Sequence, residues 1–99
     1  MKKIMTAAFQ GEHGAFSEEA AREYFGRRLA TLPKKSFDDV FHAVRKRTTE
    51  YGIVPIENSL FGSIHHTYDL LQKFDLSIIG EVKLRIVHAL LVNKGVAMP

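Results

Sequence analysis

Short, nearly continuous apolar runs recur along the chain, and each predicts a buried strand. They cover residues 4–9, 29–32, 51–56, 76–82 and 84–92. Pro33 closes the second run, and Pro55 marks the exit from the third because proline cannot donate to a central ladder. The last run alternates imperfectly, so a helix over residues 84–92 stays open on pattern alone.

The first of three predicted helices follows a turn with glycines at positions 11 and 14. Ser17 is its expected cap, and Glu18 and Glu19 lie in the first turn, where acidic side chains favour the helix dipole. Apolar residues follow at helical spacing, and Gly26 is placed to end the helix.

The second and third helices show the same periodicity. Ser36 stands three residues before Asp39, as at a capped helix start, and the apolar face comprises Phe37, Val40, Phe41 and Val44. A third helix is expected from about residue 63 to near residue 73, with one face formed by Ile64, Tyr68 and Leu71. The element order, β-α-β-α-β-α-β-β, predicts an α/β domain with a mostly parallel sheet and helices on both faces.

Composition and charge limit the function classes. The 45% hydrophobic and 25% charged residues are typical of a globular protein, and no apolar stretch approaches the ~20 residues that cross a bilayer. The chain has no cysteine, which excludes dithiol redox chemistry and fits a cytoplasmic location. The net charge of +3 is spread over small basic groups, so a small anionic ligand fits better than nucleic acid.

Two loops are candidate sites, because ligands of open α/β sheets bind beyond the carboxyl ends of the strands. In the first, QGEHGAFS, the glycines allow close backbone approach, and Ser17 and free N–H groups at the helix start point toward an anion. The second, PIENS, offers a carboxylate at Glu57, an amide at Asn58 and a hydroxyl at Ser59. Plain helix capping by Asn58 and Ser59 stays open as the alternative.

The five histidines do not indicate a metal site. His65 and His66 are adjacent, so on a helix they face about 100° apart. His13, His42 and His88 show no HExxH or comparable spacing, which favours surface or packed histidines.

Three segments resemble the amino-terminal part of the prephenate dehydratase family. They are FQGEHGAFSEEAA, VPIENSLFGSIHHTYDLL and GEVKLRIVHALLV, in the family's order and spacing. The resemblance spans nearly all of the chain, and the second segment is the family's most distinctive motif. It implies the first lobe of a two-lobed fold similar to type II periplasmic binding proteins. Residues 1–83 would form this lobe, and residues 84–99 would be the crossover strand and the start of the second lobe.

The resemblance also implies an enzyme that removes carbon dioxide and water from prephenate, giving phenylpyruvate on the route to phenylalanine without a cofactor or metal. Substrate contacts would come from the positions that match the family's cleft motifs: Gly14, Phe16, Ser17, Asn58, Ser59 and Gly62. Glu57 and His88 are expected to have structural or supporting roles, because a carboxylate at Glu57 would repel a dianion.

The chain departs from the family pattern in several features. Ala15 stands where the family usually has threonine, and Phe61 where it usually has an acid. The family's Thr-Arg-Phe motif, which holds its candidate proton donor, does not occur in the chain, so a partial catalytic domain is expected and its catalytic residues stay unassigned. Arogenate dehydration and non-catalytic binding of a small acid are the alternatives.

Residues 84–92 are expected to form an unpaired edge, which predicts a homo-oligomer.

Overall fold

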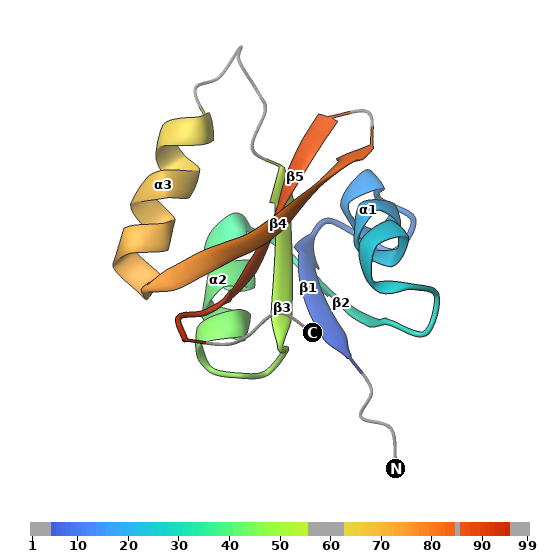
Figure 1. Cartoon of the computed structure of the whole chain (residues 1–99), viewed down its shortest axis with the longest axis horizontal. Coiled ribbons are helices and arrows are strands. Elements are labelled where there is room, and N and C mark those ends of the chain that lie inside the picture. Colours follow the sequence, from blue (N-terminus) through green and yellow to red (C-terminus); the bar gives the residue numbers. More distant parts are fainter. Residues whose placement is uncertain (1–4, 56–62, 85, 96–99) are drawn as a thin grey trace.

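The computed structural model describes residues 5–55, 63–84 and 86–95, which form a five-stranded sheet covered by helices (Figure 1). In chain order the elements are β1 (Thr6–Gln10), α1 (Phe16–Phe25), β2 (Ala30–Lys34), α2 (Phe37–Arg45), β3 (Tyr51–Pro55), α3 (Ser63–Phe74), β4 (Leu76–Leu84) and β5 (Ile86–Asn93). This is the predicted order of strands and helices, and Pro55 ends β3 as expected. Among the described helices, none combines the length and apolar content that crossing a bilayer requires.

The sheet is mixed, with strand order β2-β1-β3-β5-β4. Strand β1 runs parallel to β2 and β3, whereas β5 runs antiparallel to both β3 and β4. The expectation of a mostly parallel sheet therefore holds only for the β2-β1-β3 half. The reason is the short connection between Leu84 and Ile86, which can join antiparallel neighbours but is too short for a parallel crossover.

Strand β5 lies inside the sheet, between β3 and β4, and not at its edge. The prediction of an unpaired strand at residues 84–92 is therefore wrong, and so is the helical alternative for that segment. The sheet edges are β2 and β4. Pro33, expected to close the second strand, lies within β2 opposite Phe9, which an edge strand tolerates because one side of its ladder is open.

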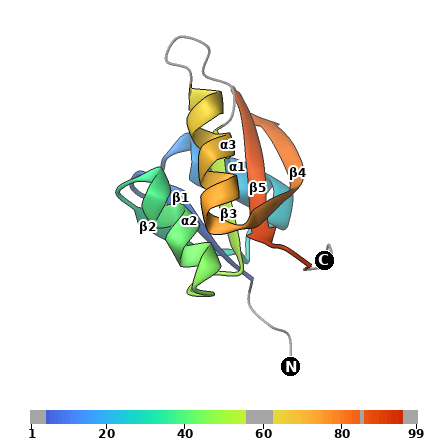
Figure 2. The same cartoon turned by 90° about the vertical axis from the view of Figure 1, so that its left-hand side faces the viewer.

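Helices cover both faces of the sheet, as predicted (Figures 1 and 2). On one face α2 and α3 pack over a buried cluster that includes Val40, Phe41, Val44, Val54, Leu70, Phe74 and Leu91. On the other face α1 packs over a cluster that includes Phe9, Ala20, Ala21, Ile53, Leu90 and Val92. The sheet residues thus alternate between two cores, as the two-residue period of a strand requires.

Helix α2 is built as its sequence predicts. The Ser36 hydroxyl accepts a hydrogen bond from the Asp39 N–H at 3.1 Å, which caps the helix start. Val40, Phe41 and Val44 are fully buried on its inner face. All the signals needed for this helix lie within nine residues, so no distant contact has to be known.

Helix α3 turns a different face to the core than predicted. Tyr68, expected inside, is 57% exposed, whereas Thr67, Leu70 and Phe74 are buried and Leu71 is partly buried. The side chain of Ile64 lies outside the described residues. The buried stripe follows positions i, i+3 and i+7, and it places the Phe74 ring 6.0 Å from the ring of Phe41 on α2. Packing against a neighbouring helix therefore selects the face of α3.

Gly52 in β3 allows α2 to approach the sheet closely, and we predict that Gly52→Ala is destabilising. A Cβ at this position would lie 2.8 Å from Val44 Cγ2 and 3.1 Å from Val40 Cγ1. Both neighbours are β-branched and cannot rotate away freely. We expect the free energy of unfolding in urea, followed by circular dichroism, to fall by about 1–3 kcal/mol. Lys83→Ala, at an exposed position of β4, should change it by less than about 0.5 kcal/mol, and equal effects of the two variants would contradict the prediction.

Candidate functional site

The candidate site lies at the end of the sheet that is formed by the carboxyl ends of β1 and β3. These strands are parallel neighbours, with Phe9 opposite Ile53, so their carboxyl ends meet at the same edge (Figure 1). The first loop, residues 11–15, leads from β1 into α1, and the second, residues 56–62, leads from β3 into α3. The described residues thus show that the two strands preceding these loops end side by side, at the end of the sheet where α/β proteins bind ligands.

The second loop carries most of the predicted polar contacts, and it falls outside the described residues. These positions are Glu57, Asn58, Ser59 and Gly62, together with the unusual Phe61. Their roles stay predictions.

The first loop is shaped differently from the sequence expectation. Ala15 is the N-cap residue of helix α1 and makes no side-chain cap bond. Ser17 is the second residue of the helix and is buried, with 9% exposure. The prediction that Ser17 caps the helix is therefore wrong. Gly14 has φ of 96°, a conformation that favours glycine, and Phe16 is 53% exposed at the rim.

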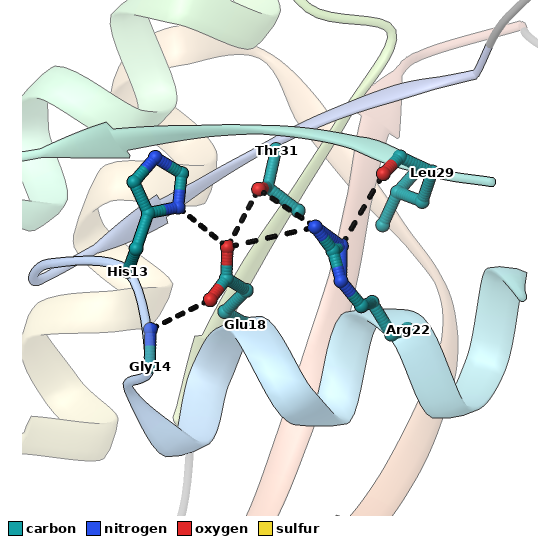
Figure 3. A network of polar contacts seen from close by, with 6 residues as sticks. All are labelled: His13, Gly14, Glu18, Arg22, Leu29 and Thr31. Atoms are coloured by element: carbon teal, nitrogen blue, oxygen red, sulfur yellow. Dashed lines mark hydrogen bonds and ion pairs between the residues drawn. The ribbon is translucent and has the colours of Figure 1, made fainter. Parts of the chain in front are cut away.

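Glu18 holds this loop in place (Figure 3). The residue is buried, with 8% exposure, and its Oε1 accepts the Gly14 N–H at 2.7 Å. Its Oε2 accepts the Thr31 hydroxyl at 2.7 Å and lies 2.7 Å from His13 Nδ1. The bond to Gly14 is close to a capping box, in which a carboxylate three residues into the helix satisfies a backbone N–H before it.

Arg22 completes the network from the next turn of α1. Its Nη2 lies 3.8 Å from Glu18 Oε2 and donates to the Thr31 hydroxyl at 3.4 Å, while Nη1 donates to the Leu29 carbonyl at 3.3 Å. Thr31 belongs to β2 and Leu29 precedes it. The first loop, α1 and β2 are therefore joined through one carboxylate.

These contacts lower the pKa of Glu18 from its ordinary value of 4.5 to about 2. The hydrogen bond from the Gly14 backbone is the largest cause, and burial opposes it by disfavouring the charged form. Further stabilisation of the anion comes from the hydroxyl of Thr31 and from the hydrogen bond and charge of His13. Glu18 is consequently ionised over the whole physiological pH range.

The carboxylate of Glu18 reduces the number of backbone N–H groups that the first loop can donate to a ligand. The Gly14 N–H is already bound to Glu18, and the Ala15 N–H donates to the Glu12 carbonyl at 3.0 Å. The helical ladder begins with the Glu19 N–H donating to the Ala15 carbonyl, so the amides of Ser17 and Glu18 precede it. The predicted set of free amides at the helix start is therefore smaller than the sequence indicates.

His88 lies at the end of the sheet from which the two loops leave. It is 1% exposed on β5, opposite Pro55, the last residue of β3, and also opposite Val82 of β4. This position fits the structural or supporting role expected for it. Among the described residues, no three histidine or carboxylate side chains come together in a way that could hold a metal ion.

A basic cavity adjoins the first loop and was not foreseen. It measures about 400 Å³ and is lined by Gly11, Glu12, Pro33, Lys34 and Lys35. Its lysines come from the carboxyl end of β2, which is parallel to β1 and ends at the same edge. Sequence reasoning also missed the roles of Glu18 and His13, although Glu18 at the third helical position was a usable capping signal.

Comparison with known proteins identifies the family. The sequence model described as prephenate dehydratase matches residues 7–99. The chain belongs to the prephenate dehydratase family. This confirms the resemblance carried by the three segments quoted above.

Individual relatives agree with this family assignment. Arogenate dehydratase/prephenate dehydratase 2, chloroplastic, of Arabidopsis thaliana is 48% identical over 89 residues, which are 90% of this chain and 23% of that protein. The solved prephenate dehydratase of Streptococcus mutans superimposes with a TM-score of 0.79 at 27% identity, covering 94% of this chain and 50% of that one. GqqA, described as a novel type of quorum quenching acylase, gives 0.79 at 28% identity, covering 95% and 50%.

The coverage shows how much of a prephenate dehydratase is present. The chain spans about a quarter of the plant relative and half of each solved chain. Its mixed α/β architecture is that of the prephenate dehydratases, whose fold is periplasmic-binding-protein-like.

We predict that the stabilising effect of Glu18 depends on pH. Because its pKa falls from 4.5 to about 2 on folding, the contribution is fully present above pH 4.5 and is lost as the pH falls through about 2. At pH 7, Glu18→Gln should lower the free energy of unfolding by on the order of 2 kcal/mol. The matched change Glu19→Gln, at an exposed position of the same turn, should have little effect. Urea titrations from pH 7 to pH 2 test this, and a difference between wild type and Glu18→Gln that stays constant would contradict it.

Proposed function

We propose that the chain is part of a prephenate dehydratase, which converts prephenate to phenylpyruvate in phenylalanine biosynthesis with loss of carbon dioxide and water. The family match over residues 7–99 carries this proposal, together with the neighbouring carboxyl ends of β1 and β3, which precede the two family-like loops. The reaction forms an aromatic ring, which supplies the driving force. The protein's task is therefore to bind a dianion, orient it and help the hydroxyl group leave.

The first loop forms one part of the proposed dianion site. Phe16 is exposed at the rim and supplies an apolar contact for the substrate ring. Ser17 follows it in the first turn of α1, where backbone N–H groups favour an anion. Gly14 keeps a backbone shape that brings the loop close to the ligand, while its own N–H is bound to Glu18.

The second loop supplies the remaining contacts in this proposal. Asn58 and Ser59 donate hydrogen bonds to substrate oxygens, and Gly62 allows close approach at the start of α3. Glu57 has a structural role, since an exposed carboxylate would repel the dianion. His88, buried beside Pro55, supports the base of this loop from β5.

The chain supplies one wall of the substrate cleft in this proposal. It lacks the family's Thr-Arg-Phe motif, so the proton donor comes from a second lobe that the chain does not contain. We divide the protein into a first lobe, residues 1–83, and residues 84–99, which lead toward the second lobe. Strand β5 is the crossover strand in this division, and it pairs with β3 and β4 in the sheet.

Arogenate is the second candidate substrate. The name of the Arabidopsis thaliana relative combines both activities, and that protein is 48% identical to this chain. Binding of a small acid without catalysis is a further alternative, because a shared fold alone does not determine an activity.

A cytoplasmic location and a homo-oligomeric state complete the proposal. The absence of cysteine supports the location, and the open edges β2 and β4 support the assembly.

A titration of the ¹⁵N-labelled chain with prephenate tests the proposed half-site. We expect saturable amide shifts in residues 14–17 and 58–62, and weaker binding of arogenate if prephenate is the substrate. Asn58→Ala should raise the Kd roughly tenfold, as expected for the loss of one hydrogen bond to a charged group. Malate serves as a control for non-specific binding of a dianion. Shifts confined to residues outside both loops, or equal binding of malate and prephenate, would refute the assignment.

A further inference from the structure

His13 presents an exposed imidazole that is fixed in orientation. The side chain is 66% exposed, yet its Nδ1 lies 2.7 Å from the buried Glu18 carboxylate. Its ring also lies 6.0 Å from the ring of Phe9, the fully buried β1 residue beneath it. An exposed side chain usually samples several rotamers, whereas this one has a carboxylate and an aromatic ring as fixed neighbours.

The contact with Glu18 requires a hydrogen on Nδ1 of His13. The pKa of Glu18 is held at about 2, so its oxygens only accept, and Nδ1 must be the donor across 2.7 Å. The other nitrogen, Nε2, points away from Glu18 in Figure 3. Carboxylates orient histidines in this way at functional sites, leaving the second nitrogen to meet a ligand.

The charges around the first loop suit a bound anion. Lys34 and Lys35 line the cavity beside Gly11 and Glu12, and Glu12 is the acidic residue that opposes them. The carboxylate of Glu18 is compensated by Gly14, Thr31 and Arg22. His13 is therefore bound to an internally neutralised acid, and Gly11 and Glu12, which precede it in the loop, line the cavity that holds the two lysines.

We propose that His13, as the imidazolium in which both ring nitrogens carry hydrogen, donates from Nε2 to one carboxylate of the dianionic substrate, and that Glu18 is the positioning residue that orients it. This inference rests on the proposed function, because it concerns the same site and ligand class. His13 would add a side-chain hydrogen-bond donor to a loop whose Gly14 N–H already donates to Glu18.

Four variants of the ¹⁵N-labelled chain, titrated with prephenate, test the proposal. His13→Gln should raise the Kd about tenfold, the effect of removing one charge-assisted hydrogen bond. His42→Gln is the matched control, an exposed histidine on α2, and should bind as wild type does. Glu18→Gln should weaken binding and alter the His13 ring ¹⁵N shifts that report which ring nitrogens carry hydrogen. The double variant His13→Gln/Glu18→Gln should bind no more weakly than His13→Gln.

The possible results separate this inference from the proposed function. If wild type binds through the two loops and His13→Gln binds equally well, the role of His13 is refuted while the half-site stands. If wild type does not bind prephenate, both proposals fail. Equal weakening by His42→Gln would show a general charge effect and would also refute the contact. Should Glu18→Gln not fold, the comparison of His13→Gln with His42→Gln still decides the question.

Discussion

Strand β5 joins the two halves of the core. Ala89 and Leu91 contribute to the cluster under α2 and α3, whereas Leu90 and Val92 contribute to the cluster under α1. Successive side chains of a strand point to opposite faces, so one register places all four residues. A slip of one residue would exchange the two sets and leave neither core filled. At its end, Asn93 donates to the Val44 carbonyl at 2.8 Å, which ties this register to α2.

This register also determines where the candidate site is held. Because Ile53 lies opposite both Phe9 and Leu90, the three central strands share one row of residues. Two positions further along β3, Pro55 is paired with the buried His88. The second loop thus leaves the sheet from a strand end that β5 pins on one side and β1 supports on the other. Binding residues are often carried on loops that a rigid scaffold of this kind positions.

The sequence predicts those parts of the fold whose causes are local. Helix α2 is one, because a serine cap and four apolar positions lie within nine residues. The position of β5 is not, because a run of buried residues is compatible with several strand orders and with a helix. The exposed Tyr68 has the same explanation, since the face that α3 buries depends on Phe41 of another helix. Strand pairing and helix packing join residues that are distant in the chain.

The same distinction applies to the site. Two glycines and a helix start at the end of β1 are visible in the sequence, and they correctly locate the first loop. Its chemistry also depends on Thr31, which lies 13 positions after Glu18 and donates to it across the α1–β2 packing. That contact helps keep Glu18 ionised and bound to Gly14, so the loop already holds an anion of its own. In the proposed site, an external dianion would therefore find its donors elsewhere: at Nε2 of His13, at the amides of Ser17 and Glu18 and in the second loop.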